Sequence, residues 1–155
     1  MKLVIAPHVI DENHLVEIIR KLKRPYVRYT RADEKNVRKA DCLIIDCFGL
    51  LSSIYRYGEI AYIGGGFGVG IHNTLEAAVY GIPVIFGPKY QKFQEAIQLL
   101  EAKGAFSVKD YEELKTLLDR MLTDEVFLRE SGMNASNYVT GNAGATDKIM
   151  SMINF

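Results

Sequence analysis

The sequence lacks most of the features that would assign it to a specialised class of protein. It has two cysteines in 155 residues, Cys42 and Cys47, which are too few for a disulfide framework and match no metal-binding spacing. We expect both to be reduced thiols of a cytoplasmic protein. No apolar run is long enough to cross a bilayer, and the run Leu3–Ala6 stops at Pro7, unlike a signal peptide.

The chain also lacks an excess of either charge. Its net charge is zero, which argues against a general nucleic-acid-binding protein, and 48% hydrophobic with 25% charged residues is typical of a globular domain. The charge is uneven, however, because residues 1–40 contain ten lysines and arginines but five acids. Either this is an ordinary solvated face, or it faces an anionic partner such as a phospholipid leaflet or an acidic ligand.

Short apolar runs alternate with helical patterns along the whole chain. Six strands are expected, at residues 3–6, 26–30, 42–46, 60–63, 83–86 and 105–108. Helices are expected at residues 11–23 and 110–123, with Asp11 and Asp110 as their caps, and at residues 50–57, 73–80 and 92–103. The remainder of the chain predicts two more helices, with glycine breaks at Gly132 and Gly141–Gly144. Fully apolar strands alternating with helices favour parallel pairing with helices on both faces. The predicted fold class is therefore α/β, a doubly wound Rossmann-like sheet formed by residues 1–155 as a single domain.

The segment Gly64–Glu76 (GGGFGVGIHNTLE) carries the clearest chemical signal, with five glycines in its first seven positions. Glycine allows positive φ and a close approach of the backbone to a ligand. The segment runs from a predicted strand into a predicted helix, whose first N–H groups and dipole suit an anion. Ligands of doubly wound sheets bind beyond the carboxyl ends of the strands. We therefore expect the segment to hold a nucleotide phosphate, with Asn73 and the N–H groups of residues 72–75 as donors.

The common phosphate fingerprints do not match this segment. There is no Gly-Lys-Ser/Thr of a P-loop, and a dinucleotide fingerprint would follow the first strand of its unit rather than lie in mid-chain. The spacing Asn73-x-x-Glu76 also fits a capping box, which would explain both residues without a ligand. The two roles are compatible, so both stay open. His72 either donates to a phosphate or sugar oxygen or has no role in binding.

The sequence AYIGGGFGVGIHNTLEAAVYGIPVIFGP, which ends at Pro88, resembles the Kdo (3-deoxy-D-manno-octulosonic acid) transferases of lipopolysaccharide assembly. That family has a glycine loop, His-Asn, two residues and Leu-Glu-Ala-Ala, followed by Pro-Val and Gly-Pro. Ala6–His8 stands where the family has a Pro-Arg-His-like turn, and Asp46–Leu51 where an acidic residue precedes a Gly-Glu-Leu-like turn. Asn142–Thr146 is similar to its C-terminal signature. The resemblance covers most of this chain, but only the second half of a full family member.

The resemblance implies a GT-B-type glycosyltransferase with two Rossmann-like domains, of which this chain would be the C-terminal, donor-binding one. The implied donor is CMP-Kdo and the implied acceptor is a lipid A precursor. The N-terminal domain, absent from this chain, would carry the acceptor site, the general base and an anchor at the cytoplasmic face of the bacterial inner membrane. We expect no catalytic residue, metal or cofactor in this chain, and no nucleic-acid partner.

The resemblance also implies which residues bind the donor. The phosphate would lie against the glycine loop and the start of the following helix, at Gly64, Gly65, Gly66, Phe67, Gly68, His72, Asn73, Thr74 and Glu76. Further contacts to the nucleotide are expected from Pro7 and His8, and from Phe48, Gly49 and Leu50 around the cytosine. Glu76 would orient the loop or accept from ribose hydroxyls.

Two positions depart from the family pattern. His8 stands where many relatives have arginine, so a phosphate contact there would be weaker and dependent on pH. Leu50 replaces the acidic residue of the Gly-Glu-Leu turn, so that only backbone contacts to the base are expected from it.

Two other classes of function remain open. The chain could be the C-terminal domain of another GT-B enzyme, a UDP-sugar transferase or epimerase, which would need a site for a second phosphate. It could instead be a non-enzymatic, flavodoxin-like nucleotide-binding module, with no missing partner domain. The first expected strand begins at residue 2 or 3, which fits either a complete small domain or a piece of a longer protein.

Overall fold

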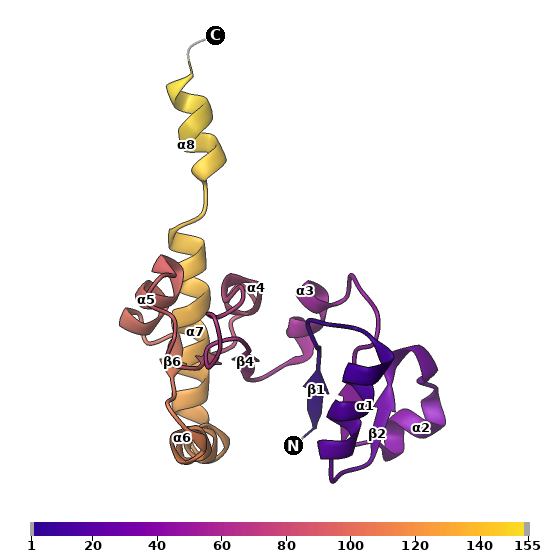
Figure 1. Cartoon of the computed structure of the whole chain (residues 1–155). Helices are drawn as coiled ribbons and strands as arrows, with labels where there is room; N and C mark the ends of the chain where they lie inside the picture. The colour runs from indigo at the N-terminus through magenta and orange to yellow at the C-terminus, as the bar shows by residue number, and fades with distance from the viewer. Residues whose placement is uncertain (1, 154–155) are drawn as a thin grey trace. The chain divides into compact units, whose positions relative to one another are not determined.

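The computed structural model describes residues 2–153, and for residues 145–148 the backbone alone. The chain divides into two compact units, Met1–Ile54 (unit 1) and Tyr55–Phe155 (unit 2), which are described separately (Figure 1). Ala145 and Thr146 of the expected C-terminal signature lie among the residues whose side chains are not described. None of the helices formed by the described residues combines the length and apolar character that crossing a bilayer requires.

Unit 1 is a three-stranded parallel sheet in the order β1-β3-β2, with β3 in the centre. Its strands are β1 (Leu3–Ile5), β2 (Tyr26–Arg28) and β3 (Cys42–Ile44). Its helices are α1 (Glu12–Lys21), the 3-10 turn η1 (Tyr29–Arg31), α2 (Glu34–Lys39) and α3 (Leu51–Ile54). The strands pair in parallel as predicted, and each is shorter than the apolar run that predicted it.

Local capping determines where the helices of unit 1 begin. Asp11 accepts a hydrogen bond from the N–H of His14 at 3.0 Å, as its place before α1 predicted. From α1, Leu15 is buried against Cys42 and Ile44 of the central strand. Cys42 and Cys47 are free thiols, as expected, Cys42 buried and Cys47 half-buried. The six-residue α2 was not predicted, although Asp33 forms a capping box at its start.

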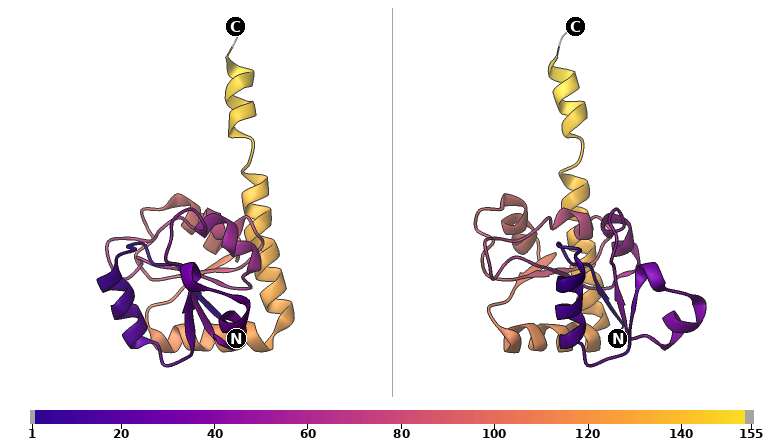
Figure 2. Two further views of the ribbon diagram at one scale, coloured as in Figure 1. Left: turned by 90° about the vertical axis from the view of Figure 1, so that its right-hand side faces the viewer. Right: turned by 45° about the vertical axis from the view of Figure 1, so that its right-hand side comes forward.

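Unit 2 contains a second three-stranded parallel sheet, in the order β4-β5-β6. Its strands are β4 (Ala61–Ile63), β5 (Val84–Phe86) and β6 (Ala105–Ser107). Its helices are the 3-10 turn η2 (Tyr55–Tyr57), α4 (Leu75–Ala78), α5 (Gln94–Glu101), α6 (Tyr111–Thr123), α7 (Glu125–Gly141) and α8 (Ala145–Met152). Figure 2 shows α8 continuing beyond the end of α7.

The central strand of unit 2 is buried on both faces. Val84 and Phe86 belong to one apolar cluster, which includes residues of α4, α5 and α7. Ile85, which points to the opposite face, belongs to a second cluster with residues of α6 and the start of α7. Helices therefore cover both faces of this sheet, as predicted, and the α/β class is confirmed.

The six strands of this α/β fold pair as two parallel sheets of three. Two expectations about the elements were wrong in extent or place. The helix expected at residues 73–80 is the single turn Leu75–Ala78, followed by Gly81 at φ +70°. Gly132 does not break a helix but lies buried inside α7. A Cβ atom on Gly132 would overlap the carbonyl oxygen of Gly81, so this glycine serves close packing of α7 against the turn after α4.

We predict that Gly132→Ala destabilises unit 2 by roughly 1–3 kcal/mol, because the added methyl group forces α7 away from Gly81. Gly141→Ala is the matched control, since it lies at the end of the same helix and a Cβ there meets nothing within 4 Å. Urea unfolding followed by far-UV circular dichroism measures both. Equal unfolding midpoints for the two variants would contradict the packing role of Gly132.

Candidate functional site

The glycine loop after β4 folds back on itself. The carbonyl oxygen of Gly65 accepts from the N–H of Gly68 at 2.8 Å and of Gly70 at 3.3 Å. Gly65 and Gly70 have φ of +88° and +146°, which side chains rarely tolerate, and a Cβ on Gly65 would overlap the carbonyl oxygen of Gly70. The N–H of His72 donates to Gly64 at 3.2 Å and closes the loop.

The loop after β4 packs against the turn after β5, backbone to backbone. A Cβ on Gly66 would lie 2.6 Å from the nitrogen of Gly87, and a Cβ on Gly87 would lie 2.7 Å from the carbonyl carbon of Gly66. The N–H of Lys89 donates to the Gly66 carbonyl at 3.0 Å. The protein's own packing therefore explains the glycines at 65, 66 and 70. A Cβ would fit at Gly64 and at Gly68, so packing does not explain these two glycines. They are the glycines of the loop that still indicate a ligand close to the backbone.

Asn73 and Glu76 do not form the capping box that their spacing allowed. The Asn73 Oδ1 accepts from the N–H of Leu75 at 2.9 Å, and its Nδ2 donates to the Glu76 Oε1 at 3.0 Å. Thr74 is the residue at the N-cap, and its side chain makes no capping bond. Asn73 thus caps the turn from one residue further out, and Glu76 orients its amide.

The N–H groups at this point are only partly available to a ligand. Of residues 72–75, His72 and Leu75 donate to oxygens within the loop. The N–H groups of Asn73 and Thr74 have no hydrogen-bond acceptor among the described residues. Because α4 is a single turn, its dipole is smaller than that of the helix the sequence predicted. Anion binding here would rely on these two N–H groups more than on the helix as a whole.

The Thr74 hydroxyl is the one buried side-chain polar atom without a hydrogen-bond partner in the described part of the chain. The residue is 1% exposed and follows directly after two exposed residues, His72 and Asn73. A buried hydroxyl without a partner costs about 1–3 kcal/mol. This hydroxyl without a partner stands at the end of the glycine loop, in the same stretch as the N–H groups of Asn73 and Thr74.

The other predicted contacts lie in unit 1. Pro7 and His8 follow β1, and Phe48, Gly49 and Leu50 follow β3, which is the parallel neighbour of β1. Both loops therefore leave the same edge of the unit 1 sheet. The ring of Phe48 is 81% exposed, and Gly49 has φ +87°. The carbonyl of Leu50 accepts from the N–H of Ser53 and Ile54 and so begins α3.

A buried ion pair ties the same edge of unit 1 together. Asp46, next to β3, accepts from the Nε of Arg28 at 2.8 Å, and from the N–H and hydroxyl of Thr30 at 2.9 and 2.6 Å. The Arg28 Nη1 also donates to Glu12 at 2.7 Å. Burial opposes ionisation of Asp46, but the hydrogen bonds from Thr30 and Arg28 outweigh it and lower its pKa to about 2. Arg28 and Thr30 were missed in the sequence, because nothing local marks them as partners of Asp46.

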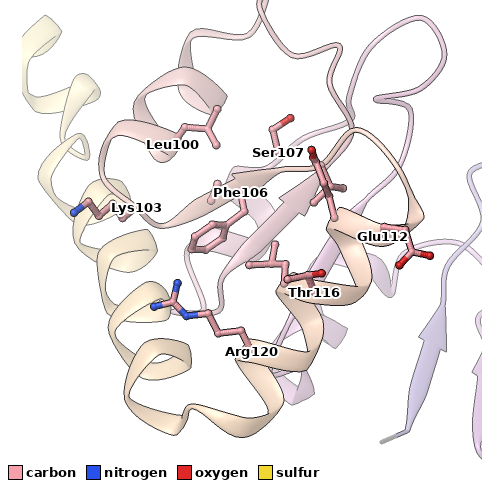
Figure 3. Close-up of a pocket in the computed structure, with 11 residues that line it drawn as sticks. Leu100, Lys103, Phe106, Ser107, Glu112, Thr116 and Arg120 are labelled. Carbon is pink, nitrogen blue, oxygen red and sulfur yellow. The ribbon is translucent and has the colours of Figure 1, made fainter.

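A groove of about 620 Å³ lies elsewhere in unit 2, between β6, the turn before it and α6 (Figure 3). The ring of Phe106 lines it together with Leu117, and Lys103 and Arg120 add cationic groups. None of the residues predicted to bind a ligand belongs to its lining. The candidate site is therefore an open surface formed by backbone at the end of β4, distinct from this groove.

No protein-family model matches the chain. A 3-deoxy-D-manno-octulosonic acid transferase of Aquifex aeolicus is 37% identical over 125 residues, which are 79% of this chain and 34% of that protein. The same enzyme of Rickettsia bellii is 32% identical over 116 residues, 73% of this chain and 28% of that protein.

This chain is a homologue of part of the Kdo transferases. A bifunctional glycosyltransferase/methyltransferase of Fusobacterium nucleatum is also 30% identical over 148 residues, 88% of this chain and 23% of that protein. The resemblance noted in the sequence is thereby confirmed. The chain spans about a third or less of the length of these relatives.

A solved structure has the same fold. The C-terminal CMP-Kdo binding domain of WaaA from Acinetobacter baumannii superimposes with a TM-score of 0.76 at 18% identity, over 88% of this chain and 72% of that one. At this identity the likeness establishes the fold, and it agrees with the family that the Kdo transferase sequences indicate.

We predict that Asp46→Asn lowers the free energy of unfolding at pH 7 by about 2 kcal/mol, since each unit of pKa shift corresponds to about 1.4 kcal/mol. Because the pKa of Asp46 is lower in the folded than in the unfolded chain, its ionised carboxylate stabilises the fold fully above the unfolded pKa of about 3.8. This stabilisation is lost as the pH falls toward 2. The difference between variant and wild type should therefore shrink from pH 7 to pH 3 in urea unfolding.

The control for this experiment is Asp41→Asn. Asp41 pairs with Lys2 at 3.2 Å, and its side chain is 41% exposed, so its loss should cost less than about 1 kcal/mol. A gap between Asp46→Asn and wild type that stays constant with pH would show that the ionised carboxylate is not what stabilises this edge.

Proposed function

We propose that residues 1–155, units 1 and 2 together, form the nucleotide-sugar-binding domain of a GT-B-type Kdo transferase, which moves Kdo from CMP-Kdo to a lipid A precursor. The observation that carries the proposal is the segment Gly64–Glu76, because it lies at the carboxyl edge of a parallel sheet in a chain homologous to Kdo transferases. The Acinetobacter neighbour, whose title describes a CMP-Kdo binding domain, supports it through its fold.

The loop would bind the single phosphate of the donor. Breaking the bond between Kdo and this phosphate leaves negative charge on CMP, and donors aimed at that charge lower the barrier. The N–H groups of Asn73 and Thr74 are suited to this role, each worth on the order of 3 kcal/mol if well placed. Gly64 and Gly68 leave room for the phosphate, and His72 and Phe67 border it.

The cytidine would be bound by the loops of unit 1. The exposed ring of Phe48 offers a face for stacking on the base, and Gly49 and Leu50 offer backbone groups. Pro7 and His8, in the loop after the neighbouring strand β1, would add further contacts to the nucleotide. Catalysis by acid or base would come from the N-terminal domain of the full enzyme at the inner membrane, so this chain would bind the donor and transfer nothing.

Calorimetric titration with CMP tests the donor site. We expect the folded chain to bind CMP more tightly than UMP, and Asn73→Ala to weaken CMP binding while the chain stays folded. The variant should weaken binding because Asn73 holds the turn that presents the N–H groups of residues 73 and 74. Titration with UDP tests the alternative of an enzyme that uses a UDP-sugar. The proposal fails if a folded sample gives no heat with CMP or binds UDP more tightly than CMP.

Thr74→Val tests whether the buried hydroxyl serves the ligand. Valine keeps the shape and removes the polar atom, so thermal stability should stay the same or rise, because the hydroxyl has no partner among the described residues. CMP affinity should fall about tenfold, the effect of losing one hydrogen bond worth roughly 1.4 kcal/mol.

Thr74→Ser is the matched control, because it keeps the hydroxyl and should retain most of the affinity. If valine lowers the stability and leaves CMP affinity unchanged, the hydroxyl has a structural role and is not part of the donor site.

A further inference from the structure

The strands of unit 1 begin side by side at the end of the sheet opposite to the loops with the predicted contacts. This end is here called the amino edge. The N–H of Leu3 donates to the carbonyl of Asp41 at 2.9 Å. The N–H groups of Asp41 and Cys42 donate to the carbonyl of Pro25 at 2.8 and 3.1 Å. The starts of β1, β2 and β3 are therefore bonded to one another, and α1 and α2 both end close to them in the chain. In Figure 1 this edge of unit 1 is where the N-terminus is marked.

The amino edge is strongly cationic. Its exposed lysines and arginines come from the residue before β1, the last turns of α1 and α2, and the loop before β2: Lys2, Arg20, Lys21, Lys23, Arg24, Arg38 and Lys39. These segments contain no acid; the residue before β3, Asp41, is an acid and pairs with Lys2 at 3.2 Å. Among the described residues the other six cations form no ion pair. Their charge is therefore directed to solvent.

Helix stability accounts for only part of this cluster. Cations in the last turns of α1 and α2 are favoured by the helix dipole, as are the acids Glu12 and Glu34 in the first turns. Lys2, Lys23 and Arg24 lie outside both helices, where the dipole gives no reason for a positive charge. Their presence beside four cations already placed by the helices concentrates charge on one surface.

Apolar side chains stand exposed within this surface. Leu3 and Tyr26, the first residues of β1 and β2, are each 44% exposed and flank Cys42 in the register of the sheet. Lysine and arginine attract anionic headgroups, while leucine and tyrosine gain from the boundary between headgroups and acyl chains. We propose that the amino edge of unit 1 docks on a membrane surface that contains anionic phospholipid.

The charge of the whole chain favours a membrane over a nucleic acid as the partner. The chain is neutral overall, and at physiological salt charges act over about 8 Å. A flat leaflet can meet one cationic edge and leave the acidic remainder of the chain in solution. Tyr26 is the one aromatic residue in the segments of this edge, which offers little for stacking nucleic-acid bases. The proposal does not depend on the donor site.

Vesicle sedimentation with the full chain tests the proposal. Vesicles of phosphatidylcholine with 30% phosphatidylglycerol should bind the chain, and vesicles of phosphatidylcholine alone should not. Each cation near an anionic surface strengthens binding on the order of fivefold, so Lys23→Glu/Arg24→Glu/Lys39→Glu should weaken it on the order of 100-fold or more. Raising NaCl from 0.05 to 0.5 M should release the wild type.

The matched control, Lys35→Glu/Lys92→Glu/Arg129→Glu, makes the same change in net charge at exposed cations that do not belong to the segments of this edge. It should bind almost as wild type does. The double variant Lys23→Ala/Arg24→Ala, which changes only the loop before β2, replaces the triple variant if that one does not fold, and should weaken binding on the order of 25-fold.

Three results would overturn the proposal. Equal binding to neutral vesicles would show that charge does not drive it, and equal losses in the two triple variants would show that net charge, not this edge, matters. Binding to a 20-nucleotide single-stranded RNA that depends on Lys23 and Arg24, without binding to anionic vesicles, would assign the edge to nucleic acid. CMP titration of the same samples shows independently whether the donor site binds, so the result for the amino edge and the result for the donor site can be told apart.

Discussion

The close approach of two backbones at the carboxyl edge of the unit 2 sheet is the constraint on which the candidate site depends. Gly66 and Gly87 belong to the turns after the adjacent strands β4 and β5, and a Cβ on either would lie within 3 Å of the other's backbone. The Lys89 N–H bond to Gly66 holds these turns in register. From there the chain folds back over Gly65 and arrives at Asn73 and Thr74, whose N–H groups remain unused among the described residues.

The start of α4 differs from four other helix starts in the described part of this chain. The helices α1, α2, α6 and α7 each follow an aspartate whose carboxylate accepts backbone N–H groups of the first turn. At each of those helix starts a carboxylate of the chain already binds N–H groups, which leaves fewer N–H groups and less positive potential for a ligand. Before α4 the cap is the neutral amide of Asn73, which satisfies one N–H, and the Thr74 hydroxyl at the N-cap satisfies none. The cap before α4 is therefore uncharged, unlike those four, and the N–H groups of Asn73 and Thr74 have no acceptor among the described residues.

Much of the fold was predictable because its determinants are local. Apolar runs predicted all six strands, and Asp11 and Asp110 were correctly expected to cap helices, since a cap depends on residues three positions apart. The partition of the strands into two sheets and the placing of Gly132 against Gly81 depend on contacts distant in sequence. The pairing of Asp46 with Arg28 is of the same kind, so the sequence showed an acid after a strand without its partner.

For the candidate site, the sequence located the loop and the structure redefines what its residues do. Asn73 was expected either to cap the helix or to contact the phosphate. Its Oδ1 and one donor of its amide are both engaged inside the turn, by Leu75 and Glu76. A phosphate would therefore meet the backbone N–H groups that Asn73 positions before it meets the side chain itself. Capping and binding are then one property of this residue, because the geometry that begins α4 is also the geometry that leaves two donors at the end of the glycine loop.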